Sequence, residues 1–500
     1  MSLEKLKLKA VLLAMVLSAQ QYNACWAQNI ALASSTIQPP TDSTIDSEST
    51  LKGTINNTDP STAVNKIDDL TRQVLLKIVQ IERFNINYSM NVAKQGRWKG
   101  WRYAGFQEVN AGMGLAGAII GTANRGSHLH TSTHLWTQVQ ESACYIPMIG
   151  SIIGASAAAF EFWVNEYHDI EATRKGFAPH AARKYVQDRV NEINALLDKR
   201  DALLKIESTA PALAGHVQVD TAEGKILDDL RDQAVLEFER FHVNARKLLA
   251  FQQAQYFFDF TKYTLNAIGY EFAYLSLHRH HRIWNYRAGV MWDIAGPIYI
   301  AGPILSRLIG KGIGEYHKHF LKPLTDDVHD RSMQTLQADE SALTRACDNV
   351  APPTTTAAID RKEIYLLQDK TFSDEISSGL KSRSKAKLTA TQNVFGGFFV
   401  GGLKLAQGIL FTIPGYYTAY HTKTIRATRV TNFDLFAASV TQIPATSYAM
   451  IDTFRIQVQG EINRHKMLKA GVHPTQVAAR RLKELNEIER KLTKGHEPTN

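Results

Sequence analysis

Histidine is the residue type whose spacing in this sequence most suggests chemistry. His130 and His134, in "HLHTSTHLW" (128–136), lie four residues apart, which places two imidazoles on one helix face where they could share a metal ion. Further histidines lie in "HRHHRIWNYR" (278–287) and "HTKTIRATR" (421–429). Each of the three loops lies between two apolar stretches and contains no Asp or Glu. They are candidates for metal ligands, or for polar loops at a membrane surface.

The loops resemble in part the histidine boxes of the membrane fatty-acid desaturases and hydroxylases. "HTSTH" (130–134) has the H-x-x-x-H form, but "HRHH" (278–281) is not H-x-x-H-H, and the third loop supplies His421 alone. The resemblance implies a metal-dependent membrane oxidase, whose di-iron centre needs more histidines than these loops provide. We therefore expect no metal, cofactor or catalytic residue, and keep the oxidase as an alternative.

No catalytic motif is evident elsewhere in the sequence. It contains no P-loop, no glycine-rich fingerprint after a strand, no G-x-S-x-G and no C-x-x-C. The sequence does not predict an enzyme.

The three loops also carry most of the chain's excess positive charge. The 500 residues have a formal net charge of +9. The lysines near the N-terminus account for the rest of the excess positive charge. No basic stripe remains to follow a phosphate backbone, so we expect no nucleic-acid partner. The positive residues of the loops are Arg125, Arg279, Arg282, Arg287, Lys423, Arg426 and Arg429.

Apolar stretches of about 20 residues flank each loop, which is the length that a helix needs to cross a bilayer. They predict three helical hairpins, at 103–164, 257–310 and 394–453. Lys and Arg in short loops mark the cytoplasmic side of a membrane protein, so we expect these loops to face the cytoplasm.

Glycines four residues apart within these stretches predict close packing between membrane helices. The pairs are Gly117/Gly121, Gly150/Gly154, Gly310/Gly314 and Gly397/Gly401.

Charged residues within the stretches are candidates for an ion or proton path, with a carboxylate paired to Lys404. The competing interpretation is that they lock neighbouring helices together. These residues are Glu108, Glu161, Glu271, Asp293 and Lys404.

Composition divides the chain into an N-terminal part and three similar segments. Residues 1–27 form a predicted signal peptide, with a basic start, an apolar core and "CWA" before Gln28. Residues 28–62, rich in Ser, Thr and Pro, predict a disordered tether. Recurring motifs predict three degenerate repeats, 63–206, 221–348 and 359–500, separated by linkers at 207–220 and 349–358.

The recurring motifs occur in the same order in each segment where they are present. "KIDDL" before "ERF" (66–84) matches "KILDDL" before "ERF" (225–241), and a Gly-x-x-Pro motif occurs at 176–179 and again at 471–474. The repeats also contain long amphipathic helices, at 181–206, 224–255 and 475–494.

The sequence thus predicts an all-α chain of three tandem degenerate repeats, each a transmembrane helical hairpin joined to long amphipathic helices. We expect an exported, multi-pass protein of the inner membrane, with the long helical segments on the periplasmic or extracellular side. The expected partners are the lipid bilayer and a protein, or a second copy, bound through the outer amphipathic helices. The predicted role is that of a membrane scaffold or interaction protein. The alternatives are a pore or transporter that uses the intramembrane charges, the metal-dependent oxidase, and a secreted soluble bundle.

Overall fold

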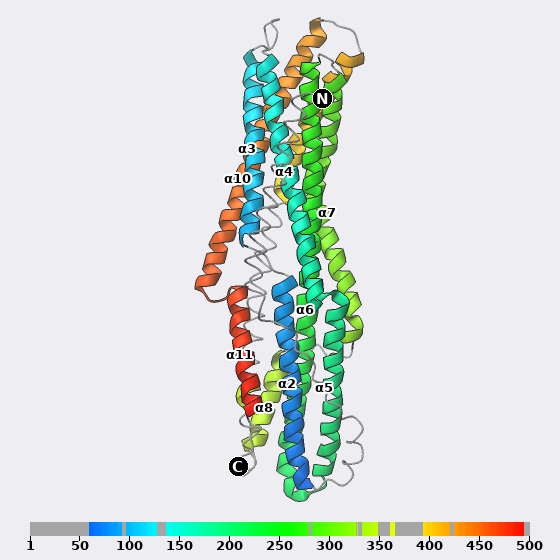
Figure 1. Ribbon diagram of the computed structural model, residues 1–500, viewed down its shortest axis with the longest axis vertical. Helices are drawn as coiled ribbons and strands as arrows, with labels where there is room; N and C mark the ends of the chain where they lie inside the picture. The colour runs from blue at the N-terminus through cyan, green and yellow to red at the C-terminus, as the bar shows by residue number, and fades with distance from the viewer. Residues whose placement is uncertain are drawn as a thin grey trace. The chain divides into compact units, whose positions relative to one another are not determined.

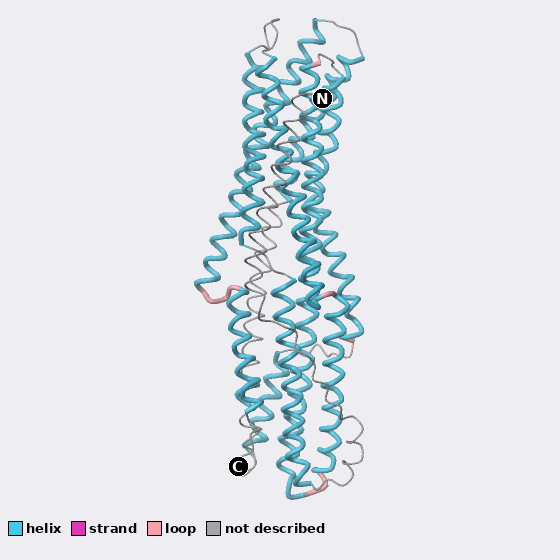
Figure 2. The backbone as a smooth tube through the Cα atoms, in the orientation of Figure 1, coloured by secondary structure: helices cyan, strands magenta, loops and turns pink. Residues whose placement is uncertain are grey.

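The computed structural model describes residues 60–92, 97–127, 137–279, 283–326, 328, 333–348, 361–365, 394–420 and 425–494. The chain divides into two units, Met1–Thr58 and Asp59–Asn500, and the first lies outside the described residues. The predicted signal peptide, and all but the end of the predicted tether, therefore also lie outside them. The part of the chain that is described is helical and contains no strand (Figure 2), which confirms the all-α prediction.

One group of helices, the amphipathic bundle, packs around a core of aliphatic and aromatic side chains. Val186, Val190, Ile193 and Leu197 recur at helical spacing and are all buried in this core, as the amphipathic pattern predicts. The bundle consists of α2 (Pro60–Val92), α5 (Pro179–Glu207), the N-terminal part of α6 (Ala214–His278), α8 (Met333–Asp348) and α11 (Pro474–Lys494), together with residues 361–365 and the C-terminal end of the helix Ile283–Thr325.

Both Gly-x-x-Pro motifs form the same kind of turn into a bundle helix. Gly176 and Gly471 have φ of 85° and 68°, a left-handed conformation that favours glycine. Three residues later Pro179 and Pro474 begin α5 and α11, because proline fits the first turn of a helix.

A second group of helices forms the apolar ring, and its helices α3 (Arg97–Ser127), α4 (Thr137–Ala172), α7 (Ile283–Thr325) and α10 (Ile425–Lys469) run lengthwise in Figure 1. Contacts between successive helices, and between the last and the first, close the ring in chain order. Each helix packs antiparallel to the next one along the chain, and the last packs on the first: Gly114 faces Thr446, and Gly126 faces Phe436. The ring consists of α3, α4, the C-terminal part of α6, α7, the helix Val394–Tyr420 and α10.

Helix α6 belongs to both groups, because it continues without a break from the bundle into the ring. The predicted amphipathic helix 224–255 and the predicted span 257–277 are parts of this one 65-residue helix. The non-α part of the predicted linker 207–220 is short, since α6 begins at Ala214. No proline follows Pro211 in this stretch, so nothing stops the helix from starting there.

Three described helical segments are long and apolar enough to cross a membrane: Thr137–Glu207, which contains α4 and α5, together with α7 and Val394–Tyr420. Four of the ring helices contain internal prolines, at Pro147 in α4, at Pro297, Pro303 and Pro323 in α7, at Pro414 in Val394–Tyr420, and at Pro444 in α10. Membrane helices tolerate such prolines because neighbouring groups satisfy the freed carbonyls.

The closest helix contact in the ring joins α7 to Val394–Tyr420 through glycines spaced seven residues apart. A Cβ at Gly408 would lie 2.7 Å from the backbone N of Asp293, and a Cβ at Gly296 would lie 2.9 Å from the backbone N of Leu405. A seven-residue spacing keeps these positions on one helix face over several turns, so the two backbones can touch throughout. The glycines of this contact are Gly289, Gly296, Gly401, Gly408 and Gly415.

Five of the eight glycines predicted to pack helices lie where the backbone of another helix approaches them closely. A Cβ at any of the five would come within 3.1 Å of a backbone carbonyl oxygen of that helix. At Gly117 of α3, for example, the Cβ would lie 2.7 Å from the carbonyl oxygen of Ala143 and 2.1 Å from the ring of Pro147, both on α4. The five are Gly117, Gly150, Gly310, Gly397 and Gly401.

At the second glycine of three of the pairs, which are Gly121, Gly154 and Gly314, the nearest atoms of the neighbouring helix belong to side chains. A Cβ would lie 3.5 Å from Ala143 Cβ at Gly121, 3.1 Å from Asn110 Nδ2 at Gly154, and 3.4 Å from Lys247 Cδ at Gly314. All three positions are buried. A four-residue spacing puts both glycines of a pair on one helix face, whereas the side chains of the partner helix decide how near its backbone can come.

We predict that Gly408→Ala destabilises the ring by about 1–3 kcal/mol, because its methyl group would push against the backbone of α7. Gly402→Ala is the matched control on the same helix, since a Cβ there meets nothing within 4 Å. Thermal unfolding of the two variants in detergent measures the difference, and equal midpoints would contradict the prediction.

Candidate functional site

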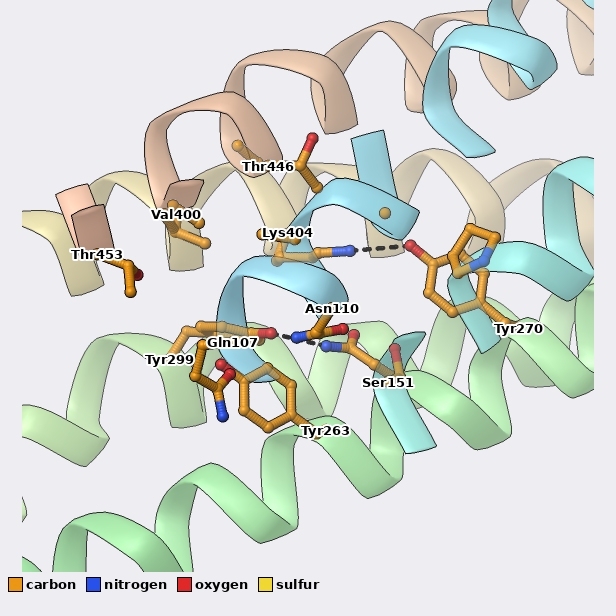
Figure 3. A pocket seen from close by; sticks show the side chains of 16 residues that line it. Gln107, Asn110, Ser151, Tyr263, Tyr270, Tyr299, Val400, Lys404, Thr446 and Thr453 are labelled. Atoms are coloured by element: carbon orange, nitrogen blue, oxygen red, sulfur yellow. Dashed lines mark hydrogen bonds between the residues drawn. The ribbon is translucent and has the colours of Figure 1, made fainter. Parts of the chain in front are cut away.

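A cavity of about 70 Å³ lies inside the apolar ring, lined by side chains from all six ring helices (Figure 3). Most of the residues that line it have polar side chains, Lys404 is the one Lys or Arg among them, and no Asp or Glu lines it. The polar lining residues are Gln107 and Asn110 of α3, Ser151 of α4, Tyr263, Asn266 and Tyr270 of α6, Tyr299 of α7, Lys404, and Thr446 and Thr453 of α10.

Lys404 is buried, with 5% of its surface exposed. Its Nζ donates to Tyr270 Oη at 3.2 Å, as Figure 3 shows, and to Gln407 Oε1 at 3.0 Å. Gln407 Nε2 donates in turn to Gln442 Oε1 at 3.1 Å, and Gln442 donates to the carbonyl of Gly114 at 3.2 Å. The network joins four ring helices. The expected carboxylate partner of Lys404 is replaced by a phenol and an amide.

Two amides at the cavity have polar atoms with no hydrogen-bond partner. Gln107 is buried and both of its side-chain atoms are unpaired. Asn266 donates to Tyr299 Oη at 2.8 Å, but its own Oδ1 has no partner. Buried polar groups are nearly always paired in folded proteins, so a wall with unpaired amides is suited to a polar occupant.

The cavity is closed along α6 in both directions. Beyond Tyr270 lies an apolar cluster in which Trp292 packs edge-on against the rings of Tyr270 and Phe411. In the other direction Lys262 and Asp259 form an ion pair at 2.5 Å, and Tyr103 donates to Asp259. The site is therefore a chamber that is bounded in these two directions and partly open elsewhere.

Four of the five predicted intramembrane charges lie away from this chamber. Glu161 is buried and accepts from Arg102 Nε at 2.7 Å, and Asp293 accepts from Thr412 Oγ1 at 2.6 Å. Glu108 is half-buried, and Glu271 is exposed on α6. Lys404 alone among the five lines the chamber, so the structure does not bring these charges together on one path.

The predicted loop arginines differ in their surroundings. Arg125 lies inside α3, not in the loop, and is buried; it donates to the carbonyl of Leu435 and to Ser439 Oγ of α10. Arg279 and Arg287 are exposed, and Arg287 lies over the Trp284 ring. The side chains of Arg282, Lys423, Arg426 and Arg429 are not among those described.

No group of three or more His, Cys, Asp or Glu that could hold a metal occurs within the described residues. Most of the loop histidines lie outside them, in 128–136 and 280–282. His278, at the end of α6, lies 3.5 Å from Glu141 and stacks on Tyr274.

No family model, curated protein or solved structure matches the chain. Its function must be inferred from its own chemistry.

The sequence did not reveal a histidine pair where the bundle meets the ring. His242 of α6 is fully buried, and its Nε2 lies 3.1 Å from Nδ1 of His317 on α7. Tyr88 of α2 stacks on His242 with 5.3 Å between ring centroids. Burial, followed by the charges of His317 and Arg246, lowers the pKa of His242 to about 3.

The bundle also buries an ionic cluster that the local sequence does not reveal. Arg361 donates to both oxygens of the fully buried Glu223, at 2.7 and 3.0 Å, and to Asp68 at 2.7 Å. Arg200 lies 3.5 Å from Glu223, and Tyr365 donates to it at 2.9 Å. Burial raises the pKa of Glu223, but the opposing charges of Arg361 and Arg200 leave it below its usual value.

We predict that Arg361→Met destabilises the bundle by about 3–5 kcal/mol, because Glu223 would be left as a buried charge with too few partners. The double variant Arg361→Met/Glu223→Leu should regain part of this loss. Arg345→Met, on the exposed face of α8, is the control and should change stability by less than about 0.5 kcal/mol. The readout is the thermal midpoint, and a single variant as stable as the control would refute the prediction.

We predict that His242 makes the protein sensitive to acid. Its pKa in the folded state lies below the ordinary 6.5, so its contribution is complete above that pH. As pH falls from 6.5 toward 3, the unfolded state gains a proton that the folded state does not, and stability falls by about 1.4 kcal/mol per pH unit.

The measurement is thermal unfolding as a function of pH for wild type and His242→Phe. The variant should lose this part of the acid sensitivity, whereas His319→Phe, on the exposed face of α7, should keep it. Parallel pH profiles for wild type and His242→Phe would contradict the assignment.

Proposed function

We propose that the chain is a multi-pass helical membrane protein that holds the amphipathic bundle rigidly outside the bilayer, as a scaffold for other proteins. The observation that carries this proposal is where large apolar side chains are exposed. Among the described residues, nearly all of them belong to the helices of the apolar ring, and none belongs to α2, α5 or α11. A ring in water would expose these side chains at a high cost in free energy, and a ring in lipid would not.

The length of the exposed apolar band fits a bilayer. On α10 it runs from Phe433 to Ile462, and on the neighbouring helix from Phe395 to Tyr420. At 1.5 Å per residue these runs are about 44 and 38 Å long, which is the thickness of the hydrocarbon core together with part of the interfacial regions.

Exposed aromatic residues lie near both ends of the band, as in membrane proteins with aromatic belts. Trp98 and Trp163 lie at the end nearer the bundle, and Tyr416, Tyr417 and Tyr420 lie at the loop end.

The finer arrangement in this proposal is a threefold repeat of hairpins, each crossing the membrane twice. The packing of α3 on α4, of α6 on α7 and of Val394–Tyr420 on α10 supports three such pairs. The short basic loops would face the cytoplasm, and the bundle would lie on the periplasmic or extracellular side of the inner membrane.

The scaffold role is supported by the continuity of α6 between ring and bundle. Its part before residue 257 spans about 65 Å at 1.5 Å per residue, with no flexible joint at the membrane. Because none of α2, α5 and α11 exposes a large apolar side chain, a partner or second copy would bind their polar, charged faces. A scaffold needs a rigid element that holds its binding surface at a fixed distance from the membrane, and it needs no catalytic group.

We predict that the protein remains in the membrane pellet after carbonate extraction and that the bundle is labelled from outside the cell. The test uses single cysteines at Ser208 and Thr355, compared with Ser132 and Thr424 in the loops, in a background where Cys25, Cys144 and Cys347 are replaced. A membrane-impermeant maleimide should label the first two in intact cells and the loop positions only after lysis.

Labelling of Ser132→Cys from outside would overturn the orientation. A protein that is released by carbonate and is monodisperse without detergent would overturn the membrane assignment and favour a secreted soluble bundle. For the scaffold role itself, crosslinking in intact cells at exposed positions of α5 and α11 should capture a defined partner or a second copy. Absence of any crosslinked species would contradict that role.

A further inference from the structure

We propose that the chamber of the apolar ring binds a small monovalent anion, such as a halide, nitrate or formate, with Lys404 as its principal ligand. This site is independent of the role proposed for the bundle.

The charge balance of the chamber is the first argument. Lys404 is buried and lines the wall, and no carboxylate lines it. Two nearby carboxylates form ion pairs with cations other than Lys404. Asp259 pairs with Lys262, and Glu161 pairs with Arg102. A buried ammonium without a counter-ion is costly, and an anion in the chamber would neutralise it.

The unpaired hydrogen-bonding groups are the second argument. A lysine ammonium has three N–H donors, and Tyr270 and Gln407 accept two of them. Gln107 is nine-tenths buried at the chamber wall, and its donor Nε2 is unpaired, as is its acceptor Oε1, to which a water beside the anion can donate. The remaining ammonium N–H and this amide are donors without acceptors, and an anion supplies acceptors. In Figure 3 Lys404 and Gln107 lie on different helices of the same chamber.

The chamber's size limits the ligand. A volume of about 70 Å³ holds roughly five water molecules. A halide or a planar oxyanion of three or four heavy atoms fits together with a water, which could donate to the free Oδ1 of Asn266. Sulfate carries two negative charges, which one ammonium does not balance. Gluconate is too large for this volume.

The test is thermal unfolding of the full-length protein in detergent at constant ionic strength, with sodium gluconate replaced stepwise by sodium chloride, nitrate or formate. Ligand that binds only the folded state raises the midpoint, and we expect an increase of about 2 °C or more at saturation. Sodium sulfate should give no saturable increase.

Two variants assign the effect to the chamber. Lys404→Met should abolish the increase, and Gln107→Leu, which leaves the hydrogen bonds of Lys404 in place, should raise the half-saturating concentration about tenfold. Lys318→Met, on the exposed face of α7, is the control and should keep the wild-type response. If Lys404→Met does not fold, Gln107→Leu still decides.

A wild-type midpoint that does not respond to small anions would overturn the proposal, as would an unchanged response in Gln107→Leu or Lys404→Met. A response that grows without saturation and is equal in Lys318→Met and Lys404→Met would show a general salt effect and would also overturn it. None of these outcomes bears on whether the bundle is a scaffold.

Discussion

The close approach of helix backbones around the apolar ring is the constraint on which the rest of the structure depends. In lipid, apolar side chains gain little by leaving their surroundings for a helix interface, so helices associate through close van der Waals contact and buried hydrogen bonds. Glycines seven residues apart allow α7 and Val394–Tyr420 to touch along several turns. This contact brings Lys404 within reach of Tyr270 on the next helix but one, and thereby forms the chamber wall.

The ring and the bundle hold together by different means, although α6 is part of both. The bundle has a core of Val, Ile, Leu and Phe, as a soluble helical domain does. In the ring, the described buried cluster is small, and hydrogen bonds among Lys404, Gln407 and Gln442 connect the helices. The bundle gains stability from excluding water. In the membrane proposed for the ring, lipid would offer its helices no such gain, and polar pairing would be needed instead.

Local sequence patterns predicted the elements well and their connections less well. The apolar stretches and the amphipathic faces depend on residues close together in sequence, and the structure places both in helices. The continuity of α6 was not predicted, because the amphipathic pattern ends at Gln255 and a more apolar stretch of about 20 residues begins at 257. Composition changes there because the surroundings of the helix change, while the backbone contains no proline or turn that would end it.

The glycine pairs also show that a local sequence pattern does not determine how closely two helices approach each other. Each pair marks a helix face that packs against a neighbour, yet Gly117 meets the backbone of α4 while Gly121, one turn further along, meets the methyl group of Ala143. The spacing of two glycines is a property of one helix, whereas the distance between two backbones depends on the side chains of both.

The candidate site was predicted only in part, because its residues lie far apart in the sequence. Lys404 was singled out as a charge within an apolar stretch, but its partner Tyr270 comes from another helix, 134 residues away in sequence. Gln442, which is linked to Lys404 through Gln407, comes from a third helix. Gln107, Asn266 and Tyr299 are uncharged, and nothing in their own helices distinguishes them from other polar residues. Arg125 shows the converse: its charge suggested a loop, yet helix α3 continues through it, and α10 supplies two acceptors that no local pattern contains. A charged residue in an apolar segment therefore indicates that a polar network lies around it. The other members of that network cannot be found from the segment itself, because they come from helices that become neighbours only when the ring closes.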